Sequence, residues 1–118
     1  MADDDRVFAK QMIGKTVVSK SGKRFGEVGD LGKITTVTDT YTILTSDETI
    51  ICNKATAFTV TLPTTIIGQI FHIKNINTGT VTVEGDGTDT IDDMTNQTLG
   101  QWDAIMVQCY ISNKWVIL

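Results

Sequence analysis

The sequence predicts an all-β protein in which short antiparallel strands form a small sandwich-like or prism-like module. Two observations support this fold class. Apolar and polar residues alternate over short stretches, which is typical of strands with one buried face. Turn-forming residues separate these stretches at short intervals. The length of 118 residues fits one ordinary domain, or two very small units that share a core.

Residues 58–75, FTVTLPTTIIGQIFHIKN, contain two of the predicted strands. Pro63 cannot donate to a sheet, so the first strand is expected to end before it. The second strand is expected from Gln69 to Asn75. The apolar faces consist of Phe58, Val60 and Leu62 in the first strand and of Phe71 and Ile73 in the second.

Composition excludes several classes of partner. The net charge is −4 and the pI is near 4.7, so no general affinity for nucleic acid is expected. Apolar runs fall far short of the roughly 20 residues that cross a bilayer, so no membrane insertion is expected. The acidic start MADDDR does not resemble a secretory signal. We expect no cofactor and no enzymatic activity.

The first 31 residues differ in charge from the rest. Strands at Thr16–Ser19 and Phe25–Leu31 flank a turn at Gly22, which predicts a β-hairpin. Its basic residues favour either a solvated edge or a surface that docks to a protein partner. The candidate docking residues are Lys15, Val17, Lys20, Lys23, Arg24 and Phe25.

Residues 7–31 resemble the opening of archaeal-type PRC-barrel proteins, which are small β-barrels that act as protein-docking adaptors. The pattern IGK-x-VVS-x-SGKR-x-G-x-V-x-D, from Ile13 to Asp30, carries the resemblance. It implies a docking role for residues 1–31. Two strands cannot bury a core alone, so further strands must come from the rest of the chain, another copy or a partner.

Residues 32–40 are rich in threonine and are expected to form a linking strand or spacer. From residue 41 onward the chain reads as a series of short strands with turns between them. These strands are YTIL (41–44), TIIC (49–52), AFTVTL (57–62), QIFHIKN (69–75), TVTVEG (80–85), DAIMVQCYIS (103–112) and KWVIL (114–118).

Residues 41–118 resemble a β-rich module found at the C-terminal ends of phage tail-fibre and other virion surface proteins. The matching positions are Tyr41, Thr42 and Asp47; Phe58 to Pro63; Gly68, Ile73, Lys74 and Asn75; Gly79 to Val83; Gly87, Thr90 and Ile91; and Trp115. Asp92 and Asp93 depart from the pattern, because a glycine turn is usual there, which leaves the local turn open.

A histidine and a glycine- and aspartate-rich segment could belong to a catalytic or a metal site, but each has a simpler interpretation. His72 is the single histidine and has no nearby nucleophile motif, so we expect it at a surface or a subunit contact. Residues 85–91, GDGTDTI, match one copy of a calcium-binding repeat, but such sites need successive copies. A plain turn is therefore expected, and no metal site.

Three aromatic residues, Trp102, Tyr110 and Trp115, are candidates for a sugar-stacking surface. The alternative for Trp115 is a lid on the core. A buried face is expected to consist of Ile105, Val107, Cys109 and Ile111. For Cys52 and Cys109 we expect buried free thiols, with a disulfide across the sheet as the alternative.

The resemblance implies a homotrimer wrapped about a threefold axis, and a threonine-rich module of this size gains stability from assembly. The residues expected in the core or at the trimer axis are Phe58, Val60, Leu62, Phe71, Ile73, Ile105 and Val107. We expect a virion surface protein, made in the host cytoplasm, whose partners are capsid or tail proteins and a glycan or protein of the host surface. The alternatives are a cellular PRC-type adaptor and a carbohydrate-binding module.

Overall fold

The structure, a computed structural model, describes residues 32–118, of which residues 33–118 form one compact unit. The candidate docking residues 15–25 and the PRC-like segment lie outside the described part. Residues 32–118 contain no helix, which confirms the all-β class. The ten strands are β1 (Ile34–Val37), β2 (Tyr41–Thr42), β3 (Thr49–Cys52), β4 (Phe58–Thr61), β5 (Ile70–Asn75), β6 (Val81–Glu84), β7 (Thr90–Ile91), β8 (Asn96–Leu99), β9 (Ala104–Ile111) and β10 (Lys114–Ile117).

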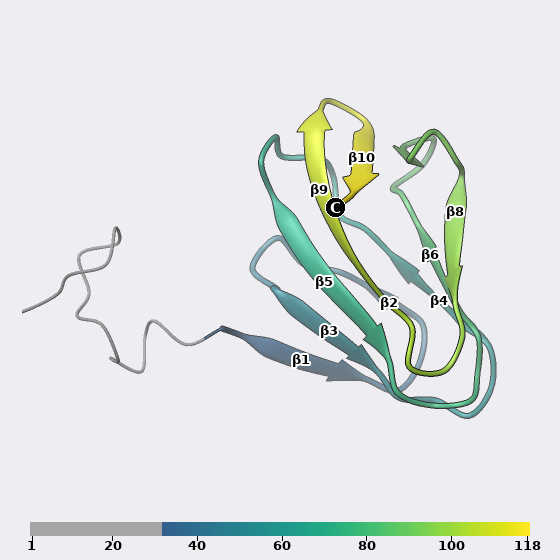
Figure 1. The fold of residues 1–118 in the computed structure, drawn as a ribbon. Helices are drawn as coiled ribbons and strands as arrows, with labels where there is room; N and C mark the ends of the chain where they lie inside the picture. Colours follow the sequence, from purple (N-terminus) through teal and green to yellow (C-terminus); the bar gives the residue numbers. More distant parts are fainter. Residues whose placement is uncertain (1–31) are drawn as a thin grey trace, which may run out of the picture. The chain divides into compact units, whose positions relative to one another are not determined.

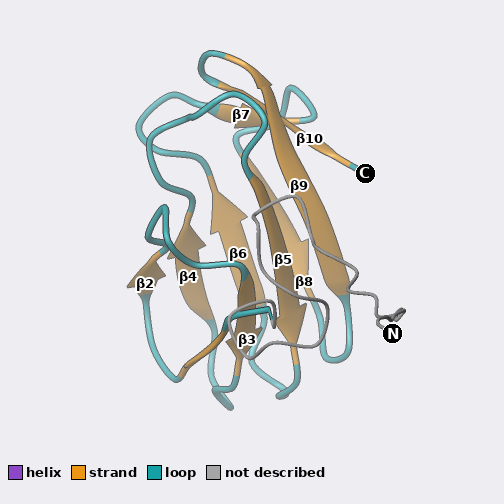
Figure 2. Ribbon diagram, turned by 90° about the vertical axis from the view of Figure 1, so that its left-hand side faces the viewer, coloured by secondary structure: helices purple, strands orange, loops and turns teal. Residues whose placement is uncertain are grey.

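The strands form two sheets that the chain visits in turn (Figure 1). One sheet has six strands in the order β1-β3-β5-β9-β10-β7, and the other has four in the order β2-β4-β6-β8. The first six strands alternate between the sheets, so the chain makes three turns of a flattened coil. Figure 2 shows β2, β4 and β6 as neighbours in the four-stranded sheet.

The expectation of antiparallel strands is wrong for most of the pairs. Five pairings are parallel, namely β1–β3, β3–β5, β2–β4, β4–β6 and β7–β10. In the first four pairs the reason is that each strand is followed by a loop to the opposite sheet, so the next strand of the same sheet runs in the same direction. Only β5–β9, β9–β10 and β6–β8 are antiparallel within residues 32–118.

The segment 32–40, for which the sequence left a linking strand or a spacer open, contributes β1 to the six-stranded sheet. Ile34 to Val37 pair in parallel with Thr49 to Cys52 of β3. At the other end of the coil, β8 and β9 close the two sheets by antiparallel pairing with β6 and β5. The sheet of β1 is therefore assembled from both ends of the described chain.

The core lies between the two sheets, and the predicted faces of the central stretch are confirmed. Phe58, Val60, Leu62, Phe71 and Ile73 are all buried in one cluster. β4 ends at Thr61, before Pro63, and β5 begins at Ile70, close to the expected bounds.

The end of β9 corrects one prediction about the core. Ile111 is 46% exposed, whereas Val107 and Cys109 are buried and Ile105 is partly buried. The pairing of β9 with β10 shifts between Lys114 and Trp115, and this irregularity removes Ile111 from the buried face. The Trp115 ring fills the core there, with its centroid 5.8 Å from that of Phe71.

Asp92 and Asp93 form the turn that the sequence left open. Both residues have positive φ, 51° and 60°, and the backbones of Ile91 and Met94 exchange hydrogen bonds of 2.8 and 2.9 Å. Two central residues with positive φ are the pattern of a type I′ turn, in which glycine and asparagine are preferred. The turn is thus formed here with aspartate at both central positions.

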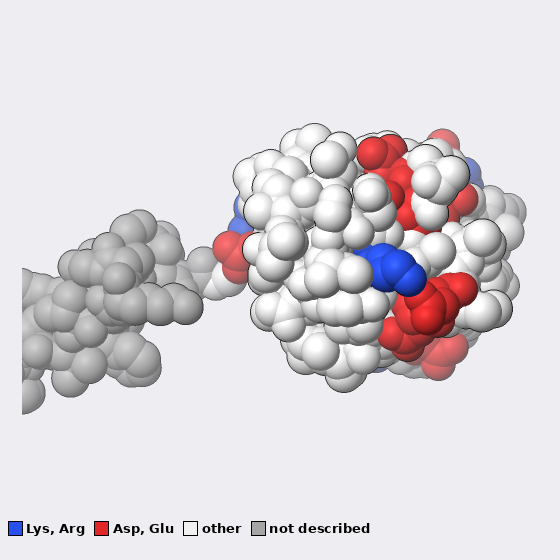
Figure 3. Space-filling model, turned by 90° about the horizontal axis from the view of Figure 1, so that it is seen from above, with Lys and Arg blue, Asp and Glu red and all other residues white. Residues whose placement is uncertain are grey.

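Charge is unevenly spread over the described residues. Residues 32–118 contain four lysines and nine aspartates and glutamates, which gives a net charge of −5. Figure 3 shows acidic side chains in several groups, with basic side chains next to them, and uncharged surface over most of that view. No helix in residues 32–118 has the length and apolar character needed to span a membrane.

Candidate functional site

A buried carboxylate holds the loop between β2 and β3. Asp47 is 2% exposed and accepts hydrogen bonds from the Tyr41 hydroxyl at 2.6 Å, the Leu44 amide at 2.9 Å and the Thr35 hydroxyl at 3.0 Å. The Lys33 ammonium lies 3.3 Å from the same carboxylate. We call these five residues the Asp47 node. It joins β1 and β2 to the loop that leads into β3.

Ionisation of the Asp47 node follows from these contacts. Burial disfavours the charged carboxylate, but the hydrogen bonds from Tyr41, Leu44 and Thr35 outweigh it and lower the pKa of Asp47 below its usual value. The hydrogen bond to Asp47, with burial as the second cause, raises the pKa of Tyr41 to about 12. The carboxylate is therefore charged and the phenol neutral near pH 7.

A second buried polar group, Asn75, holds the opposite end of the coil. Its side-chain amide donates to the carbonyl oxygens of Gly79 at 2.9 Å and Leu99 at 3.0 Å, and its oxygen accepts from the Asn77 amide at 3.1 Å. Asn75 is fully buried. The side chain thereby ties β5 to the turn before β6 and to the end of β8.

Gly79 is required next to Asn75 for steric reasons. A Cβ atom at position 79 would lie 2.2 Å from the carbonyl oxygen of Thr56, far inside van der Waals contact. Backbone atoms of two successive coil turns meet at this point. Glycine at position 79 therefore permits the close approach of the two turns.

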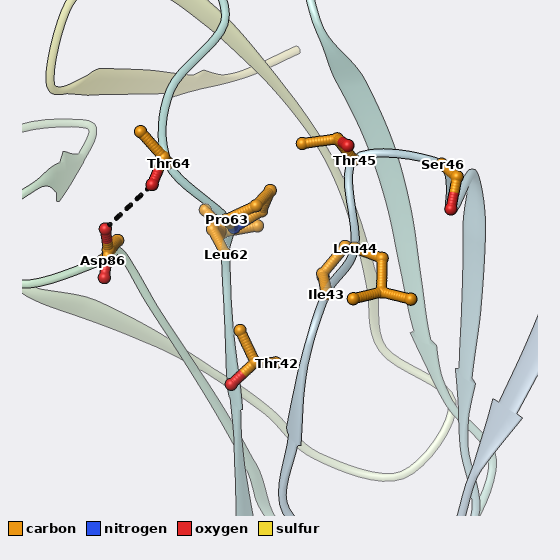
Figure 4. A pocket seen from close by; sticks show the side chains of 9 residues that line it. All are labelled: Thr42, Ile43, Leu44, Thr45, Ser46, Leu62, Pro63, Thr64 and Asp86. Carbon is orange, nitrogen blue, oxygen red and sulfur yellow. Dashed lines mark hydrogen bonds between the residues drawn. The ribbon is translucent and has the colours of Figure 1, made fainter.

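An open groove of about 520 Å³ adjoins the loop that Asp47 holds (Figure 4). Its walls come from residues 42–46, residues 62–64 and Asp86, and the Thr64 hydroxyl donates to Asp86 at 3.3 Å. The lining is aliphatic and hydroxylic with one carboxylate. It can hold a ligand by contact and hydrogen bonds, but it offers no paired nucleophile and base.

The three candidate sugar-stacking residues are not brought together. Trp102 is 62% exposed at the start of β9, and Tyr110 is exposed at the other end, roughly 26 Å away for an extended strand of this length. Trp115 is 1% exposed and lies in the core, where its ring is unavailable to a ligand. Of the three, Trp102 presents the largest exposed ring, and the Lys74 ammonium lies 5.9 Å from its centroid.

The two cysteines are both buried and free, and they lie at different ends of the six-stranded sheet. Cys52 is opposite Asn75 at one end of β5, whereas the Cys109 amide donates to the Gln69 carbonyl before the other end. Six residues of extended strand correspond to about 20 Å, and a disulfide requires Cα atoms within about 7 Å. The disulfide alternative is therefore excluded in this structure.

His72 and the 85–91 segment occupy simple structural positions. His72 is exposed on the outer face of the six-stranded sheet, opposite Thr49 and Met106. In the 85–91 turn, the Asp89 amide donates to the Asp86 carbonyl, and the Asp89 carboxylate accepts from Asn113 at 2.8 Å. No group of three or more potential metal ligands comes together within residues 32–118.

The residues proposed for the core or the trimer axis all belong to the core of a single chain. Six of the seven are buried, and Ile105 packs against them. Their side chains lie between the two sheets, so a contact between copies would have to use other residues. The sequence predicts four of the loop-holding residues only as motif positions, because their spacing alone does not reveal what they bind. They are Tyr41, Asp47, Asn75 and Gly79.

Together, the fold and these groups define an all-β module in which successive coil turns are joined by buried polar side chains. Comparison with protein-family models found no match, and comparison with curated proteins found none either.

Proposed function

We propose that the protein is a structural component of a virion surface, a capsid decoration or a short head fibre. Residues 33–118 form a trimeric β module that projects outward. The N-terminal segment, through Lys15 to Phe25, docks it to capsid or tail proteins.

One observation carries this proposal. Positions that match the virion-module pattern, Asp47, Asn75 and Gly79, are the residues that hold the loops of this fold. A motif made of loop-holding residues is expected where selection acts on a rigid scaffold rather than on reacting groups. The lining of the groove beside the Asp47 node is consistent with a structural role, because it has no paired nucleophile and base.

The solution mass of the protein tests the proposal. Light scattering after size exclusion is applied to the full chain and to residues 33–118, with circular dichroism to verify that the shorter chain is folded. A trimer in both forms supports assembly through the β module. A monomer in both forms overturns the proposal, and so does a trimer that requires residues 1–32.

Attachment to a glycan at Trp102 is a second candidate function. The observation in its favour is an indole ring that is 62% exposed beside the Lys74 ammonium. Exposed aromatic rings with a polar neighbour suit stacking on a sugar face. A glycan array probed with the full chain, with Trp102→Ala and with Tyr110→Ala as a control, tests it. Binding that disappears only in Trp102→Ala supports this function, and the absence of glycan binding by the wild type excludes it.

A further inference from the structure

The two sheets of the module present different outer faces. In the four-stranded sheet the outward residues are mainly threonines: Thr59, Thr82 and Thr98 lie side by side, and Thr61 lies beside Glu84. This face is polar and suited to water. The outer face of the six-stranded sheet can therefore be compared with this polar face of the same molecule.

The six-stranded sheet carries large apolar side chains on its outer face. They are Ile34, Ile51, Ile70, Met106 and Val116, contributed by five neighbouring strands. Ile34 is 68% exposed and Ile70 is 38% exposed. Uncharged polar residues, among them Thr49 and His72, lie between them in register. Ile51, Met106 and Val116 are part-exposed. The register places Ile34 diagonally beside Ile51, and Ile70 and Val116 diagonally beside Met106, so the face carries two apolar groups. Apolar surface gathered on one face in this way marks an interaction site.

Charge on this face favours contact with another copy of the same chain. None of the outward residues of β1, β3, β5, β9 and β10 is acidic, although residues 32–118 carry a net charge of −5. Two lysines lie on this face and both are engaged within the chain: Lys74, in register with Ile51, donates to the Trp102 carbonyl at 2.6 Å, and Lys114 pairs with Asp93 at 2.9 Å. Because this face has no acidic side chain, two copies of an acidic protein can meet through it without repulsion between carboxylates.

The area of this face is of the order that a protein–protein interface needs. Five strands at about 4.8 Å spacing and three rows of side chains cover roughly 500 Å² in projection. A standard interface buries about 800 Å² of accessible surface per partner, and a corrugated face has more accessible surface than its projection. Loops at the edge of the sheet need to supply only the difference between the area of this face and that of a standard interface.

We propose that the outer face of the six-stranded sheet is the contact between copies of this chain, turned toward the threefold axis of the trimer. The inference rests on the proposed trimer and names its contact surface. Three copies arranged in this way would enclose the apolar side chains and leave the threonine faces toward solvent. Phe58 and Phe71, first considered for the axis, remain inside each chain.

A matched pair of charge insertions in the full chain tests this surface. Thr49→Glu places a carboxylate on the proposed contact, whereas Thr82→Glu places one on the threonine face. Both threonines are half-buried residues of strands with a neighbour on each side. Sedimentation velocity over a concentration series measures the mass, and circular dichroism verifies the fold. Met106→Glu serves as a second contact variant if Thr49→Glu does not fold.

The expected result is a trimer for the wild type and Thr82→Glu, with at least a tenfold rise in the dissociation constant for Thr49→Glu. A Thr49→Glu protein that assembles like the wild type overturns the contact surface while the proposed trimer stands. Equal weakening by both variants also overturns it, because the effect would then not depend on the face. A monomeric wild type overturns the trimer itself and the inference with it.

Discussion

The phenolic oxygen of Tyr41 lies 2.6 Å from Oδ2 of Asp47, and both residues belong to the Asp47 node, whose central carboxylate is buried. Asp47 follows Tyr41 by six residues, across the loop from β2 toward β3. A carboxylate in this position cannot be left without donors, because an unpaired buried charge is costly. The six-residue spacing between Tyr41 and Asp47 is thus explained by the closure of one coil turn.

Removal of the Tyr41 hydroxyl is expected to destabilise the module. Tyr41→Phe leaves Asp47 one donor short, and hydrogen bonds to charged groups contribute about 1.5–3 kcal/mol. Urea unfolding of the variant should show a free energy of unfolding lower by about that amount. The control is Tyr110→Phe, whose ring is 47% exposed, with an expected change below about 0.5 kcal/mol. Equal effects of the two changes would contradict the role of the node.

Alkaline pH should weaken the same contact. In the folded chain the pKa of Tyr41 is raised to about 12 from the ordinary tyrosine value of 10.0 by the hydrogen bond to Asp47. The stability that this group contributes is therefore fully present below pH 10 and is lost as the pH rises toward 12. Urea midpoints at a series of pH values from 9 to 12 measure this loss. Tyr41→Phe should lose less stability than the wild type over that window, and parallel curves would argue against the assignment.

Gly79 is expected to tolerate no side chain. Alanine at this position would bring its Cβ within 2.2 Å of the Thr56 carbonyl oxygen, so two backbone segments would have to separate. We expect Gly79→Ala to lower the free energy of unfolding by about 3 kcal/mol or more, or to prevent folding. Gly100→Ala is the control, because its Cβ would meet only the Asp103 carboxylate, at 3.3 Å. A melting temperature of Gly79→Ala close to that of Gly100→Ala would refute the steric argument.

The sequence predicts the strands of this fold better than their partners. Alternation in 58–62 and 69–75 fixes which side chains are buried, because successive side chains in a strand point to opposite faces. It does not state which strand lies alongside, so parallel stacking through two sheets was not foreseen. β7 and β8 were missed because they are short or polar, TI and NQTL.

For the candidate site residues too, the sequence predicts burial better than it predicts contacts. Burial of Trp115 was foreseen as one alternative, because it ends a strand with an apolar face. The structural roles of Asp47 and Asn75 were not foreseen. Each of these side chains binds a group that is distant in the sequence, Thr35 for Asp47 and Leu99 for Asn75. Contacts of this kind depend on how the turns stack, and local pattern carries no information about stacking.

The turn at Asp92 and Asp93 offers a stabilising change. Both residues have positive φ, which favours asparagine followed by glycine in a type I′ turn. Asp92→Asn keeps an oxygen for the Ile117 amide, now bound at 3.0 Å, and Asp93→Gly relieves backbone strain. Loss of the exposed ion pair with Lys114 costs little. We expect the double variant to raise the free energy of unfolding by about 0.5–1 kcal/mol, and a decrease in thermal denaturation would contradict it.

Both thiols should remain free and unreactive while the protein is folded. Burial raises the pKa of Cys52 to about 11, and burial is also the main cause of the raised pKa of Cys109. Because the thiolate is the reactive form, alkylation by iodoacetamide at pH 8 should be slow in the native protein. In urea both cysteines should react at the rate of a free thiol, and intact mass should show two additions. Rapid native labelling at either position, or a mass lower by two hydrogens after oxidation without aggregation, would contradict the position of these cysteines at opposite ends of the sheet.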